Sequence, residues 1–216
     1  GWASVQLDGG IDRAIDRIAQ WFAAAPGVAA PATPTPAGLE ALALGVVTEG
    51  KPAAGASEAF AWVTRRILLA GGSVLLPEGD PLLAHPAFTT RVLGSTTPRA
   101  TLAYGQPISR PGLHLVATET DHWVENVTGL AGCGVHAVLG LAGVTAQPGH
   151  PLVPVIQFAQ AEVTPDVDGA LSGNSVADAT AMLERVIATL RGAATAAATQ
   201  GVEDFQLTRG LLGVST

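Results

Sequence analysis

The chain has 216 residues, enough for one large domain or two small ones with a substantial buried core. Hydrophobic residues make up 48% and charged residues 13%, which is typical of a globular protein with little charged surface. The net charge of −7, with only 11 Lys and Arg and no basic cluster, argues against binding to nucleic acid or to a membrane. A single cysteine, no long apolar run and no export-type N-terminus lead us to expect a cytoplasmic protein.

The first part of the chain is predicted to form a helix and a connector. Apolar residues recur at helical spacing between Ile11 and Phe22, which predicts an N-terminal helix within residues 1–28. Three prolines then indicate an extended connector over residues 29–38. Residues 39–216 are expected to form an α/β core, so that the whole chain is one domain.

Apolar runs and helical patterns alternate along this core. We expect strands at 42–47, 73–76, 100–104, 113–118, 135–141 and 153–158. Helices are expected at 56–70, 124–131 and 175–191, the last opened by a capping box formed by Ser175 and Asp178. The Ala- and Thr-rich stretch 192–200 either extends that helix or frays. Buried strands alternating with helices predict a mainly parallel sheet flanked by helices in a single layered domain.

Three polar loops follow predicted strands, at residues 48–51, 118–122 and 143–150. In parallel sheets, ligands bind where loops leave the carboxyl ends of the strands. The second loop contains Glu119, Asp121 and His122, side chains that suit a divalent metal such as iron or manganese. The alternatives are that these side chains are solvated, or that Asp121 caps the helix that follows.

The same loops supply candidates for catalysis. A metal at the second loop would polarise the carboxylate of a hydroxy acid while a base takes the proton from the adjacent carbon. Glu119, Asp121, His122 and His150 are the candidate catalytic residues. His150 could equally be a loop histidine that bonds to the backbone. The substrate carboxylate could be held by Lys51 or Arg99.

Other polar residues and two further histidines complete the set. The remaining candidates for substrate binding are Thr48, Thr97, Thr118 and Gly149. His114 and His136 fall inside apolar runs, so they are predicted to be sheet histidines with satisfied hydrogen bonds.

Five segments carry a resemblance to a known family, and they occur in the same order as in that family. They are GSTTP (94–98), GQPISRPG (105–112), LHLVATE (113–119), VTGLAGCG (127–134) and GHPLVPVIQF (149–158). The chain resembles the C-terminal domain of the altronate/galactarate dehydratase family, which removes water from sugar acids, and the related sulfolactate sulfo-lyase large subunit. The likeness covers nearly the whole chain.

The resemblance implies a carbon–oxygen lyase that acts on a small hydroxy or sugar acid with help from a metal. It also implies a homo-oligomer, or a separate subunit that carries the N-terminal domains of full-length members. Two polar loops of the family are replaced here, by residues 48–52 and 140–144. The alternative is therefore a ligand-binding or assembly subunit of a split lyase, without catalysis of its own.

Overall fold

A computed structural model describes residues 9–10, 12–13, 15–16, 20, 37–160 and 166–206. The chain divides into two units, Gly1–Pro36 and Ala37–Thr216. In the first unit, residues 12, 13, 15, 16 and 20 are helical, within the range predicted for the N-terminal helix. Most of the predicted connector, residues 29–36, lies outside the described residues. The second unit carries the sites described below.

The second unit is built on six parallel strands in the order β3–β2–β1–β4–β5–β6. The strands are β1 (Ala43–Thr48), β2 (Ser73–Pro77), β3 (Gly112–Val116), β4 (Ala137–Ala142), β5 (Val155–Ala159) and β6 (Gly169–Ala170). The parallel sheet confirms the predicted α/β class. Its order is that of a doubly wound sheet, in which the direction of winding reverses between β1 and β4.

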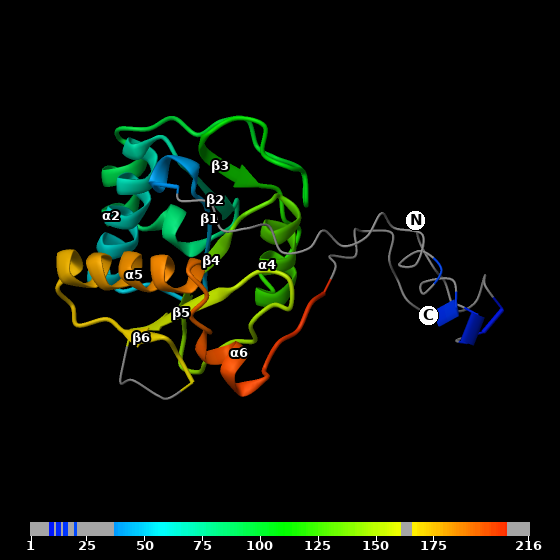
Figure 1. The fold of residues 1–216 in the computed structure, drawn as a ribbon. Coiled ribbons are helices and arrows are strands. Elements are labelled where there is room, and N and C mark those ends of the chain that lie inside the picture. The colour runs from blue at the N-terminus through cyan, green and yellow to red at the C-terminus, as the bar shows by residue number, and fades with distance from the viewer. Residues whose placement is uncertain are drawn as a thin grey trace. The chain divides into compact units, whose positions relative to one another are not determined.

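Helices cover both faces of this sheet (Figure 1). On one face, α2 (Ala54–Ala70) packs beside α5 (Ser175–Leu190), and on the other face α4 (Trp123–Gly132) lies over β1, β2 and β4. The shorter elements are η1 (Leu39–Ala41), η2 (Pro81–Ala84), α3 (Pro86–Phe88), η3 (Thr89–Leu93) and α6 (Ala196–Gln200). Among the described residues, no helix combines the length and apolarity needed to cross a membrane.

Each face of the sheet has its own hydrophobic core. Leu44 and Val46 of β1 join the core beneath α2 and α5, whereas Val47 joins the core beneath α4. The second core also contains Cys133, which is fully buried. Because the strands are buried on both faces, they appear in the sequence as nearly continuous apolar runs. The strands predicted at 42–47, 73–76, 113–118, 135–141 and 153–158 are confirmed, with ends shifted by one or two residues.

The strand predicted at residues 100–104 is wrong. This segment makes a single bridge to the sheet, in which the amide of Leu102 donates to Leu115 and its carbonyl oxygen accepts from Ala117. Gly105 then adopts a φ of +67° and turns the chain away from β3. The apolar run at 100–104 therefore packs against α4 without extending the sheet.

The ends of the C-terminal helices also differ from expectation. Asn174 caps α5, because its Oδ1 accepts from the amide of Ala177 at 3.3 Å, so the predicted capping box at Ser175 is wrong by one residue. Gly192 ends the helix segment with a φ of +105°, and α6 begins anew after Thr195, which caps it. The stretch 192–200 therefore neither extends α5 nor frays.

Candidate functional site

A cavity of about 450 Å³ lies at the carboxyl end of β1, on the side of the sheet covered by α4. It is lined by Val47, Thr48, Glu49, Asp121, His122, Trp123, Val124, Gln147, Pro148 and Asp204. We call it the β1 pocket. All three polar loops singled out in the sequence contribute to it. It lies beside the reversal in strand order, where doubly wound sheets bind their ligands.

Glu49 lines the pocket and is held by two hydrogen bonds to the backbone. Its own amide donates to the carbonyl oxygen of Leu141 at 2.9 Å, which extends the pairing of β1 with β4. Its Oε2 accepts from the amide of Gly143 at 3.1 Å. One carboxylate oxygen is thus bound to the loop after β4, and Oε1 is left for a ligand.

Trp123 joins the start of α4 to the loop after β4. Its Nε1 donates to the carbonyl oxygen of Pro148 at 3.0 Å. Its ring lies against Gly140 of β4, where a side chain would overlap the indole. The glycine therefore lets the ring approach the sheet, and the ring sets the position of the first turn of α4 at the edge of the pocket.

The first turn of α4 presents free amide groups. His122 occupies the N-cap position, but its side chain makes no capping hydrogen bond, and Asp121 does not cap the helix either. The amides of Trp123 and Val124 donate to no acceptor in the described part of the chain. Both residues line the pocket. Unpaired amides and the helix dipole favour a negative group at this end of the pocket.

The segment 202–206, here called the C-terminal strap, supplies the last wall. The amide of Gly149 donates to Val202 at 2.9 Å, and the amide of Asp204 donates back to Gly149 at 3.1 Å. Farther on, the amide of Gln206 donates to Oγ1 of Thr128 on α4 at 3.2 Å. These three bonds bring the Asp204 side chain to the pocket.

The pocket is acidic. Glu49, Asp121 and Asp204 provide three carboxylates, and His122 provides one imidazole. None of its described lining residues is Lys or Arg. Carboxylates accept hydrogen bonds from hydroxyl groups, whereas a negative ligand group is favoured only at the α4 amides.

Asp80 lies behind the pocket, where it receives two backbone hydrogen bonds. The amide of Thr48 donates to its Oδ2 at 2.8 Å, and the amide of Leu82 donates to its Oδ1 at 2.9 Å. Burial raises the pKa of Asp80 from 3.8 to about 7, although these bonds and the nearby Thr48 hydroxyl oppose the shift. That hydroxyl lies near the carboxyl group but meets no partner with hydrogen-bond geometry.

His150 is buried next to the strap rather than in the lining of the pocket. Its Nδ1 accepts from the amide of Leu152 at 3.2 Å, so the proton of the neutral ring is on Nε2. Nε2 is buried and has no partner among the described residues. Burial lowers the pKa of His150, and the charge of Glu203 partly offsets this effect.

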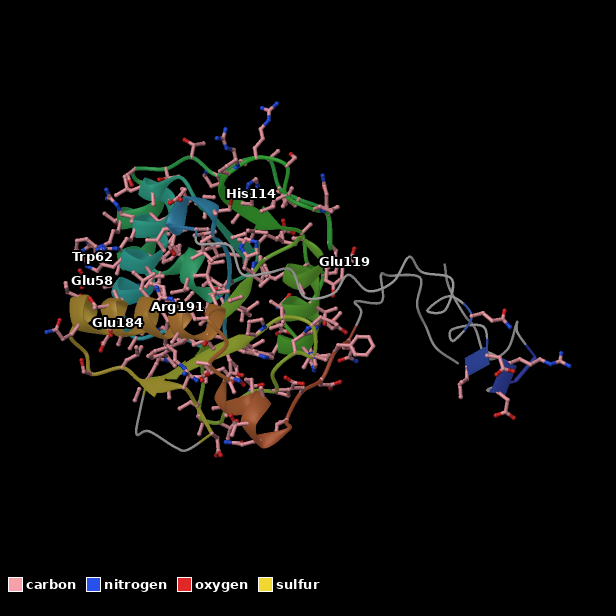
Figure 2. All side chains as sticks on the ribbon, viewed as in Figure 1. Glu58, Trp62, His114, Glu119, Glu184 and Arg191 are labelled. Atoms are coloured by element: carbon pink, nitrogen blue, oxygen red, sulfur yellow. The ribbon has the colours of Figure 1, made fainter. Side chains whose placement is uncertain are left out.

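The structure separates the residues that the sequence grouped together. Thr48, Asp121 and His122 line the pocket, whereas Glu119 is exposed outside it (Figure 2). Lys51 is also exposed and lies outside the lining. Gly149 touches the strap, as described above.

The other predicted binding residues lie elsewhere. Arg99 pairs through its amide with Leu113, at the amino end of β3, and Thr97 is exposed two residues earlier. The pocket is at the opposite, carboxyl edge of the sheet. Thr118 follows β3 and is partly buried, with its Oγ1 lacking a partner, and it does not line the pocket.

The donor groups do not fit a preformed metal centre. Within the described residues, no group of three or more His, Cys, Asp or Glu side chains is placed to hold a metal ion. Glu119, Asp121 and His122 are all described, and only the last two share the pocket. We therefore assign no step of a reaction to a bound metal.

Sequence reasoning missed three carboxylates, those of Glu49, Asp80 and Asp204. Glu49 lies in the first polar loop, from which only Thr48 and Lys51 are predicted to bind a ligand. A signal for Asp80 is present, because an Asp-Pro pair three residues after a buried strand is a typical N-cap of a short helix. Asp204 reaches the pocket from a segment far away in the chain, and local sequence patterns do not reveal such a contact.

Comparison with known proteins does not extend this picture. No protein-family model matches the sequence, and a comparison with curated proteins finds no match. The fold and the pocket geometry are thus the basis for a functional proposal, together with the sequence resemblance.

Proposed function

We propose that the protein binds a small hydroxy acid in the β1 pocket and removes water from it. The observation that carries this proposal is the pairing of free α4 amides with carboxylates in one cavity. The amides of Trp123 and Val124 receive the substrate carboxylate, and the carboxylates accept hydrogen bonds from its hydroxyl groups. The resemblance to sugar-acid dehydratases supports the same substrate class.

His122 is the group best suited to move the proton. It lines the pocket, and an imidazole can both accept and donate a proton. We assign it the removal of the proton from the carbon next to the carboxylate. It then returns this proton to the departing hydroxyl group, so that the C–O bond breaks and water leaves. The substrate is a 2,3-dihydroxy acid that loses the hydroxyl group of carbon 3 and keeps that of carbon 2, so the enol that remains becomes a 2-oxo acid; Asp121 stabilises the charged imidazolium.

The test is the appearance of a 2-oxo acid from a panel of sugar acids and small hydroxy acids. Assays are run with a chelator and with added Mn²⁺ or Fe²⁺. We expect turnover that falls about a hundredfold or more in His122→Asn and Asp121→Asn. Glu119→Gln is the matched control, because Glu119 lies outside the pocket, and it should retain activity.

Two other outcomes would change the proposal. Turnover that depends on added metal and is lost in Glu119→Gln would support the metal site expected from the sequence. Binding without turnover, measured as a rise in the unfolding temperature, would favour the second candidate, a ligand-binding subunit of a split lyase. If no hydroxy acid binds or reacts, the proposed substrate class is wrong.

A further inference from the structure

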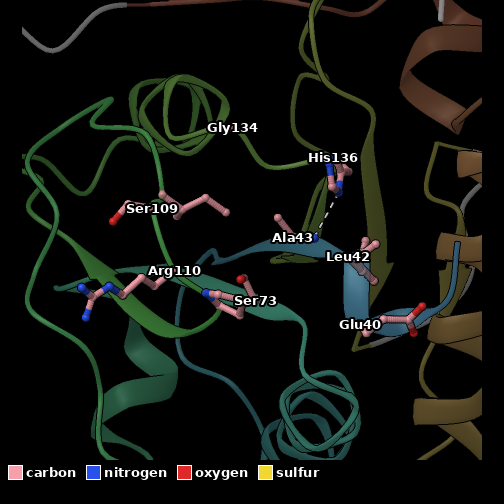
Figure 3. Close-up of a pocket in the computed structure, with 11 residues that line it drawn as sticks. Glu40, Leu42, Ala43, Ser73, Ser109, Arg110, Gly134 and His136 are labelled. Atoms are coloured by element: carbon pink, nitrogen blue, oxygen red, sulfur yellow. Dashed lines mark hydrogen bonds between the residues drawn. The ribbon is translucent and has the colours of Figure 1, made fainter.

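A second hollow lies at the opposite, amino edge of the sheet. It has a volume of about 230 Å³ and is formed by the starts of β1 and β2, the loop 108–111 and the residues before β4 (Figure 3). Its lining residues are Glu40, Ala41, Leu42, Ala43, Ser73, Ile108, Ser109, Arg110, Pro111, Gly134 and His136. We call it the amino-edge hollow. The proposed lyase chemistry uses none of these residues.

His136 is an exposed residue just before β4 that offers one hydrogen-bond donor to the hollow. Its Nδ1 accepts from the amide of Ala43 at 3.1 Å, the bond drawn in Figure 3. An accepting Nδ1 carries no proton, so the proton of the neutral ring is on Nε2. Nε2 makes no hydrogen bond within the described residues. The predicted role as a satisfied sheet histidine is therefore met by only one of the two ring nitrogens.

Ser73 adds a hydroxyl group at the first position of β2. The residue is 4% exposed and lines the hollow, and its amide donates to Leu42 at 2.7 Å. The hydroxyl itself has no hydrogen-bond partner in the part of the chain that the structure describes. The hydroxyl oxygen is reached by solvent, so it can donate a hydrogen bond to a ligand in the hollow.

Arg110 and Ser109 bring two more donors on a fixed loop. His114 of β3 is buried, and its Nε2 donates to the carbonyl oxygen of Arg110 at 2.8 Å. The amide of Ile108 donates to Cys133 at 3.1 Å. The backbone of the loop is thus attached to β3 and to the end of α4. The guanidinium of Arg110 is exposed and forms no ion pair with a described residue.

The balance of charge in the hollow differs from that of the whole protein. Its lining contains one acidic residue, Glu40, whose Oε1 already accepts from the amide of Gly38 at 3.0 Å. Figure 3 shows Glu40 and Arg110 on opposite sides of the hollow. Free donors therefore outnumber free acceptors here, although the chain carries a net charge of −7.

We propose that the amino-edge hollow binds a phosphate group. The donors come from three separate segments, namely the start of β2, the loop 108–111 and the segment that ends at His136. A carboxylate has two oxygens in one plane, whereas a phosphate directs oxygens to several sides at once. A tetrahedral oxyanion can therefore meet all three segments, and it is stabilised by the Arg110 charge.

The test is a titration of the full chain with inorganic phosphate at about pH 8, where free histidine is neutral. Acetate and chloride at equal ionic strength are the comparison ions. We expect phosphate to shift the NMR signals of the His136 ring and acetate to leave them nearly unchanged. Arg110→Gln and Ser73→Ala should each raise the dissociation constant about tenfold. Arg66→Gln, an exposed change on α2, should leave it unchanged.

The proposal fails if phosphate leaves the His136 signals in place or if acetate binds equally well. It also fails if Arg110→Gln and Ser73→Ala bind phosphate like the Arg66→Gln control. Circular dichroism first establishes that each variant is folded. If Ser73→Ala does not fold, the exposed Arg110→Gln change alone decides the result.

Discussion

Asp80 shows how a single residue can make stability depend on pH. Its carboxyl group has a pKa of about 7 in the folded chain and an ordinary value of 3.8. Between these values the folded chain keeps a proton that the unfolded chain has lost. The free energy of unfolding should therefore fall as pH rises from about 4 to about 7, by about 4 kcal/mol, and stay level above that range.

Urea denaturation at about pH 5 and about pH 8 checks this prediction. His150 acts in the opposite direction, because burial lowers its pKa and stability is lost as pH falls below its ordinary value of 6.5. The comparison is therefore made against Asp80→Asn, which retains His150. We compare the free energy of unfolding at about pH 8 with that at about pH 5 in each protein. In Asp80→Asn the value at about pH 8 should be higher, relative to the value at about pH 5, than it is in the unchanged chain. If the free energy of unfolding changes between the two pH values by the same amount in both proteins, the raised pKa of Asp80 is contradicted.

Asp168 is the second residue on which stability should depend strongly. Its side chain is 1% exposed, and its Oδ1 accepts from Nη2 of Arg185 at 2.6 Å and from the amide of Ala196 at 3.0 Å. Its Oδ2 accepts from the amide of Gln157 at 2.8 Å. The carboxylate thereby connects β5, α5 and α6. A sequence pattern gives no indication of such a set of partners.

We expect Asp168→Ala to lower the free energy of unfolding by about 3–5 kcal/mol, because it leaves two amides without their acceptor and the Arg185 guanidinium without its carboxylate partner. The matched control is Glu58→Ala, which removes the more exposed ion pair between Glu58 and Arg91. That change should cost about 1 kcal/mol or less. Both variants are measured by chemical denaturation. If they lose the same free energy of unfolding, burial does not determine how much each ion pair stabilises the fold.

At the scale of elements, the contact of α4 with β4 depends on the absence of a side chain. Gly140→Ala would place a methyl group in the Trp123 ring. We expect a loss of about 1–3 kcal/mol in stability and a change in tryptophan fluorescence, since the first turn of α4 must move. Gly79→Ala is the control, because no atom lies within 4 Å of the added methyl group. If both variants show the same stability and the same tryptophan fluorescence, the contact between Gly140 and Trp123 does not stabilise the fold.

The elements were predictable where burial alone determines them. Strands β1 and β4 are apolar on both faces, and α2 ends at Gly71, so composition and periodicity locate them. The segment 100–104 has the same apolar character, but its hydrogen bonds depend on where Gly105 and β3 lie in space. Propensity cannot distinguish a packed loop from a strand in such a case.

The candidate site was predictable in part for the same reason. The rule that ligands bind at carboxyl ends of parallel strands selects the loops that contain Glu49, Asp121 and His122. It cannot select among residues within a loop, and Glu119 was grouped with its neighbours because of sequence spacing alone. Asp204 lies on the C-terminal strap. The strap is held at the pocket by its backbone hydrogen bonds with Gly149, which connect residues far apart in the sequence.

At the scale of the whole molecule, stability should be highest at the centre of the sheet. Strand β1 pairs with β2 on one side and β4 on the other, and both of its faces are covered. Hydrogen exchange should therefore be slowest at Val46 and Leu139 and much faster along the strap. Exchange measured by NMR checks this order. Equal protection in the strap and in β1 would contradict it.

The position of β1 also has a consequence for how the protein is made. Its first partner, β2, begins at Ser73, so one side of β1 can be paired soon after synthesis. Its second partner, β4, begins at Ala137, and residues 49–136 must leave the ribosome before the other side is paired. During that interval an apolar strand keeps one edge open. The nascent chain should therefore be most prone to aggregation, and most in need of a chaperone, before β4 emerges.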